Sequence, residues 1–142
     1  PALHRSSFES AGSDAIVDWA QTVAVLTEAV AAVVGRAEIK SSDLVLEGVH
    51  IIPANGLLEA WRRSGGEACG ILLRVDNEKT HQDFIKSREK HNGKGVAHYL
   101  KNLDRIRKIQ DHMTIIAEHS DWLSIDASID ENPIALIENS FE

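Results

Sequence analysis

The sequence has few of the residues that build cross-linked or membrane-embedded proteins. Its only cysteine, Cys69, excludes an intrachain disulfide and suits a reducing compartment, so we expect a cytoplasmic protein. Aromatic residues make up 5% of the chain, and it holds three prolines. The longest apolar run, residues 22–34, contains Glu28 and is too short to span a bilayer. Disulfide scaffolds, collagens and low-complexity chains are therefore excluded, and no membrane partner is expected.

The composition that is present is typical of one globular domain with a sizeable core. The chain has 142 residues, of which 43% are hydrophobic and 26% charged, and we expect a single domain over residues 1–142. Fifteen basic and twenty-two acidic residues give a formal charge of −7, which argues against a general nucleic-acid binder.

Apolar periodicity predicts helices that alternate with strands. Helical spacing covers residues 13–35, 57–63, 77–90 and 96–118 and a closing segment that starts near 132, whereas the apolar runs 43–52, 69–75 and 121–127 are typical of strands. Ser13 is the expected N-cap of the first helix and Gly35 its stop. This order predicts an α/β fold with a parallel sheet flanked by helices, in which ligands bind at the carboxyl ends of the strands.

Charge is concentrated in one stretch. Between Lys79 and Lys108, nine basic residues face three acidic ones, a net charge of +6, whereas the rest of the chain carries −13. A basic region of this kind, about residues 79–108, suits a lid over phosphate groups. A solvated helical face balanced by acids elsewhere in space is the alternative.

Other candidate site residues lie outside the basic region. Glu47 and the glycine after it break the apolar run 43–52 at what would be the carboxyl end of the strand, where a carboxylate suits Mg²⁺ or a substrate hydroxyl. A capping or ion-paired glutamate is the alternative. One arginine and two hydroxyls in the run His4–Ser7 are suited to an anion, although a polar tail has the same composition. The histidines do not have metal-site spacing, and no structural metal is expected.

Several segments in order resemble the archaeal 2-phosphoglycerate kinase family, a branch of the P-loop kinases, in the part that follows the Walker A loop. The matching segments are Leu3–Glu9, Leu46–Pro53, His81–Arg88, Tyr99–Leu100 and Ile106–Gln110. The run Glu-Gly-Val-His-Ile-Ile-Pro, which starts at Glu47, is the most specific of them.

The resemblance implies a P-loop kinase-like fold and ATP-dependent phosphorylation of 2-phosphoglycerate to 2,3-bisphosphoglycerate, with Mg²⁺. Glu47 takes the Mg²⁺ or acceptor-hydroxyl position, and Arg107 is a further phosphate contact. The implied lid over the nucleotide phosphates contains Arg88, Lys90 and Lys94. The implied acceptor-side residues are His4, Arg5, Ser6 and His50.

The sequence departs from the family in three places. It has no Gly-x-x-x-x-Gly-Lys-Ser/Thr motif, Asp83 stands where a basic residue is expected, and Ala54 replaces an expected glycine after Pro53. We therefore expect a portion without the Walker A strand-loop-helix, or a truncated homologue, that is inactive alone and takes a small phosphorylated substrate. The alternative is a non-catalytic binding or regulatory remnant that self-associates, docks a partner or pairs with a missing N-terminal portion. A nucleic-acid partner is not expected, because only Phe84 and Tyr99 interleave with the cations.

Overall fold

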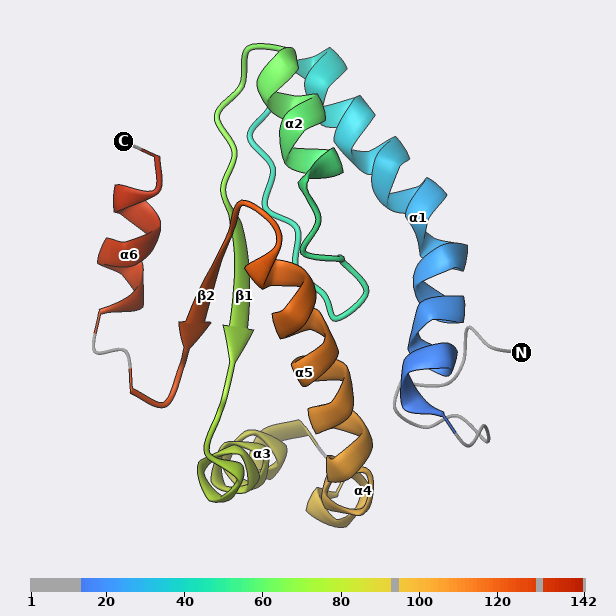
Figure 1. Cartoon of the computed structure of the whole chain (residues 1–142), viewed down its shortest axis with the longest axis vertical. Coiled ribbons are helices and arrows are strands. Elements are labelled where there is room, and N and C mark those ends of the chain that lie inside the picture. The colour runs from blue at the N-terminus through green and yellow to red at the C-terminus, as the bar shows by residue number, and fades with distance from the viewer. Residues whose placement is uncertain (1–13, 93–94, 130–131, 142) are drawn as a thin grey trace.

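The computed structural model describes residues 14–92, 95–129 and 132–141, which form six helices and two strands (Figure 1). In chain order the elements are α1 (Ala15–Lys40), α2 (Asn55–Arg63), β1 (Gly70–Arg74), α3 (Glu78–Asn92), α4 (Val96–Lys101), α5 (Leu103–Glu118), β2 (Trp122–Asp126) and α6 (Pro133–Asn139). The mixed α/β class is thereby confirmed. The finer P-loop kinase-like assignment stays a proposal.

The sheet consists of two parallel strands. β1 pairs with β2 in a register that runs from Gly70 opposite Trp122 to Arg74 opposite Asp126. The helix α5 packs against both strands, and α1 packs against α5, while α6 lies on the far side of the strands from α1 (Figure 1). The predicted strands 69–75 and 121–127 and their parallel arrangement are confirmed.

The core lies between α1, α5 and β1. Trp19 of α1 is 2% exposed and packs with Leu72 of β1 and with Ile109 and Met113 of α5 in one buried cluster. Its indole N–H donates to the carbonyl of Val49 across 2.7 Å, so the ring ties α1 to the chain that precedes α2. One tryptophan thus joins three parts of the fold through burial and a hydrogen bond.

The ends of α1 differ from the prediction. Asp14 is the N-cap, because its carboxylate accepts from the backbone N–H groups of Ile16 and Val17, and Ser13 lies outside the described residues. The helix continues through Gly35 to Lys40 and ends at Ser41 in a left-handed conformation. The stop predicted at Gly35 is wrong, because buried Val34 and Ala37 on either side favour a continued helix over the glycine's preference for a turn.

The strand predicted over residues 43–52 is absent. Residues 42–48 are neither helical nor sheet-paired, and Val45 is 92% exposed. Within the described part of the chain, no backbone hydrogen bond joins this segment to β1. An apolar β-branched run forms a strand only beside a partner strand, and the prediction fails because this segment has no such neighbour.

The helix predicted over 96–118 is interrupted. It divides into α4 and α5 at Asn102, whose side-chain amide donates to the carbonyl of His98 across 2.9 Å. Asparagine side chains compete with the backbone in this way and thereby interrupt helices. The predicted closing helix is confirmed, with Asn132 as its side-chain cap and Pro133 in its first turn.

Among the described helices, α1 alone has the length and composition to cross a membrane. Its mean hydropathy over 18 residues is 1.4, and 11% of that window is buried. The helix spans residues 15–40 and is therefore longer than the apolar run 22–34. Core helices pass the same test, and Trp19 and Val23 of α1 are core residues. A cytoplasmic location stays a prediction.

Candidate functional site

The carboxyl ends of both strands point toward α3 and α4 (Figure 1). The chain that leaves β1 is held there by α5. Arg107 donates to the carbonyls of Val75 (3.2 Å) and Asp76 (2.9 Å), and Gln110 both donates to and accepts from Val75. Arg107, a basic residue of the lid-like region, therefore lies at the carboxyl end of β1, where ligands of parallel sheets bind.

His81 of α3 is a titratable group of this region. It is half-buried on the first turns of α3, and its Nδ1 atom is buried without a hydrogen-bond partner. Burial lowers the pKa of His81 below 6.5, and the positive charges of Arg107 and Arg88 lower it further. Both arginines therefore disfavour the protonated form of this imidazole, and its neutral form can donate or accept a hydrogen bond.

Arg88 is held by two neighbours in the α3–α4 region. Its Nε atom donates to Oε1 of Glu89 across 3.0 Å, and its guanidinium carbon lies 4.9 Å from the ring centroid of Tyr99. The side chain of Glu89 is 1% exposed, whereas that of Arg88 is 57% exposed. A buried carboxylate and an aromatic face thus contact a guanidinium that still reaches solvent.

Two lysines of α3 bind an acid on their own helix. Asp83 accepts from Lys79 across 2.8 Å and from Lys86 across 3.2 Å. These contacts lower the pKa of Asp83 and raise the pKa of Lys79. The acid that departs from the family pattern thus pairs with lysines, and Arg88 pairs with Glu89 instead.

The carboxylate at the end of β2 closes a turn. Asp126 is buried and accepts from the hydroxyl (2.6 Å) and the backbone N–H (2.9 Å) of Ser128. The hydroxyl contact is the main cause that lowers the pKa of Asp126, and the backbone N–H groups of Ser128 and Asp76 lower it further. The carboxylate of Asp126 therefore accepts hydrogen bonds within the turn, and Asp126 is a poor candidate for substrate chemistry.

The positive charges of Arg88 and Arg107 both act on His81, and the role of the basic region as a lid stays a prediction. Glu47 is exposed and lies on the unpaired segment, so it does not stand at the end of a strand. Its predicted position was the reason to expect it to bind Mg²⁺ or a substrate hydroxyl, and that reason no longer holds. His50 is half-buried, its Nε2 atom has no partner, and burial lowers its pKa. Four predicted residues, His4, Arg5, Ser6 and Lys94, lie outside the described residues, as does the side chain of Lys90.

Glu89, Tyr99 and His81 were not predicted as site residues. His81 and Tyr99 lie inside segments that carry the family resemblance, so that signal was available. Glu89 was counted only as one of three acids in the basic region, and nothing in its spacing distinguishes a buried carboxylate from a surface one.

In the part of the chain that the structure describes, no three His, Cys, Asp or Glu side chains gather into a metal-binding group. Comparison of the chain with protein-family models, curated proteins and solved structures finds no match. The residues themselves therefore carry the functional argument.

Proposed function

We propose that the chain is a 2-phosphoglycerate kinase-like protein that binds a small phosphorylated hydroxy acid at the carboxyl end of its sheet. The observation that supports this function is the cationic group at the carboxyl end of β1: Arg107 donates to the carbonyl of Val75 there, and α3, which follows, carries the exposed guanidinium of Arg88. Two guanidinium charges and an imidazole match a phosphate dianion better than they match a neutral ligand.

The proposed kinase chemistry uses the carboxylate of Glu47 and the basic region together. Phosphoryl transfer depends mainly on positioning and on cations that offset phosphate charge. ATP and Mg²⁺ are part of the proposal through the resemblance, and Mg²⁺ would be held by Glu47 with substrate phosphates, as one carboxylate commonly suffices. The sequence has no Walker A motif to cradle the nucleotide, so we expect acceptor binding without phosphoryl transfer by this chain alone.

Calorimetry with 2-phosphoglycerate tests the proposal. We expect the chain to bind it and Arg88→Gln to weaken binding about tenfold, since a charge-assisted bidentate contact is lost. Lys79→Gln is the matched control: it removes the same charge from an exposed side chain of the same helix that pairs with Asp83. Equal affinity for glycerate, which has no phosphate, would contradict the proposal, as would no binding at millimolar 2-phosphoglycerate.

A non-catalytic module that self-associates through its sheet is the second candidate. It is supported by the unpaired apolar segment that contains Val45, since exposed strand-forming residues and a sheet of only two strands both favour strand pairing with a second copy. Light scattering should then give an oligomer that Val45→Asp dissociates. Clear micromolar binding of MgATP by the chain alone would contradict this candidate.

A further inference from the structure

The guanidinium group of Arg88 contacts two protein groups. Its Nε–H donates to Glu89, and its central carbon lies over the Tyr99 ring, 4.9 Å from the ring centroid. In the described region the N–H groups on its two Nη atoms have no protein acceptor, and 57% of the side chain is exposed. Two parallel N–H groups in this geometry match two oxygens of a phosphate.

The contact between Arg88 and Glu89 is not a usual helix pair. Adjacent residues on a helix point in different directions, so Arg88 has to fold back along α3 to reach the carboxylate. Glu89 is nonetheless buried, and its second oxygen, Oε2, is buried without a hydrogen-bond partner. A buried ion pair seldom adds stability over apolar residues of the same size, so stability does not explain this carboxylate.

We infer that Glu89 and Tyr99 are positioning residues that hold Arg88 as a preformed fork for a phosphate monoester. The inference rests on the proposed function and names Arg88 of the lid-like region as the residue that binds the phosphate of the ligand. Preorganisation explains both neighbours, because a guanidinium already fixed at Nε and on one face loses little freedom when phosphate binds. Lys79 and Lys86 of α3 are less suited, since both pair with Asp83.

A charge effect and a positioning effect predict opposite changes in phosphate affinity for Glu89→Gln. Glu89→Gln removes a negative charge beside the fork, and Coulomb attraction alone would then tighten anion binding. Loss of positioning weakens it instead. Asp83→Asn removes the same charge from the same helix without touching the fork, so it should tighten phosphate binding or leave it unchanged.

The test is a titration of the full chain with inorganic phosphate, followed by NMR at the Nε–H resonance of Arg88. We expect phosphate to shift that resonance in the wild type, and Glu89→Gln to weaken binding about fivefold while the thermal midpoint stays within a few degrees. Arg88→Lys keeps the charge but lacks the fork, and should weaken binding about tenfold.

Unchanged or tighter binding in Glu89→Gln would overturn the inference, and so would a wild-type Nε–H resonance that does not respond to phosphate. If Glu89→Gln does not fold, Tyr99→Leu decides in its place, because it removes the aromatic face and leaves the ion pair. A fork that grips phosphate with no preference for 2-phosphoglycerate would contradict the proposed function and leave the inference standing.

Discussion

The guanidinium of Arg105 on α5 donates to the carboxylate of Asp18 on α1 across 2.7 Å, and the two side chains are 20% and 14% exposed. This ion pair links two helices that are far apart in sequence at the edge of the shared core. It lies one residue from Trp19, so it fixes the end of α1 that carries the core tryptophan.

Asp18→Asn should lower the free energy of unfolding by about 2 kcal/mol, the usual worth of a partly buried hydrogen bond to a charged group. Urea denaturation measures this change. Glu28→Gln removes the same charge at an exposed position of α1 and should change stability by less than about 0.5 kcal/mol. Equal losses in both variants would show that net charge, not the ion pair, is responsible.

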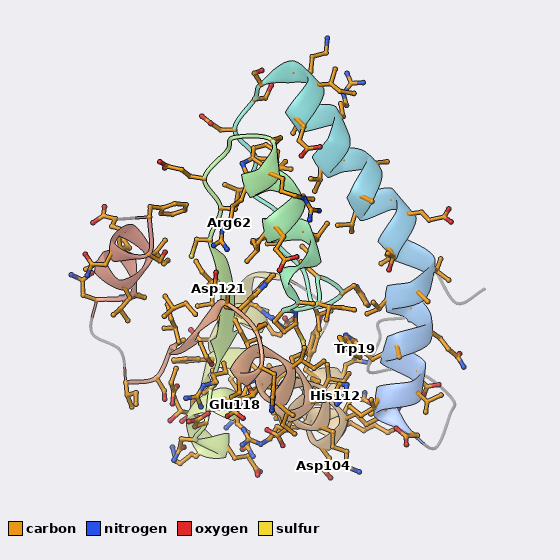
Figure 2. All side chains as sticks on the ribbon, turned by 45° about the horizontal axis from the view of Figure 1, so that its top comes forward. Trp19, Arg62, Asp104, His112, Glu118 and Asp121 are labelled. Carbon is orange, nitrogen blue, oxygen red and sulfur yellow. The ribbon has the colours of Figure 1, made fainter. Side chains whose placement is uncertain are left out.

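Trp19→Phe should lower the free energy of unfolding by about 2 kcal/mol, because the carbonyl of Val49 loses its donor while most of the apolar ring is kept. Trp19 and His112 point toward one another in edge contact, with ring centroids 5.5 Å apart (Figure 2). Trp19→Ala also empties the core and should cost about 3–5 kcal/mol. Val25→Ala, at an exposed site on the same helix, is the control, and a comparable loss there would contradict the assignment.

Replacing two glycines by alanine should change the stability of the protein in opposite directions. At Gly70 of β1 an added Cβ would lie 2.3 Å from the Trp122 ring, so Gly70→Ala should destabilise the protein by about 1–3 kcal/mol. At Gly35, inside α1, nothing lies within 4 Å of that position, and Gly35→Ala should stabilise by about 0.5–1 kcal/mol. Thermal unfolding gives both signs, and a destabilised Gly35→Ala would mean that α1 ends earlier than Lys40.

Stability should fall as the pH drops below 6.5, in part because of His81. The pKa of His81 is lowered in the folded state, so below 6.5 the unfolded chain binds more protons and is favoured. His81→Gln should therefore lose less stability than the wild type between pH 7.5 and pH 5. His50, whose pKa burial also lowers, should account for part of the remaining change, as His50→Gln would measure. Parallel pH profiles for His81→Gln and the wild type would contradict this.

Local signals were enough for the elements that have a packed face. The apolar stripe of the predicted helix 96–118 includes the buried residues Ile109 and Met113 of α5, and Asn132 with Pro133 predicted the start of α6. Both β1 and β2 were also predicted, since each is short, apolar and bounded by turn residues. In these places the sequence pattern and the tertiary environment favour the same structure.

The segment 43–52 shows what the sequence could not decide. Its apolar run is typical of a buried strand, yet strand formation depends on a neighbour that is distant in the chain. The position of Glu47 at a strand end depended on the same assumption and fails with it. Arg88 and Arg107 were predicted through the family resemblance, whereas the burial of Glu89 follows from how α3 packs, which no local pattern shows.

The pairing of β1 with β2 also has a consequence for the order of folding. The strands end and begin at Arg74 and Trp122, and all of α3, α4 and α5 lies between them. Their ladder therefore forms only after a long stretch of chain has closed, whereas the helices form from local contacts. Leu72 and Ile125 are both buried in the folded protein. Until the ladder forms, they lie on strands that have not yet paired. The refolding chain thus passes through a period in which its sheet is open to other molecules.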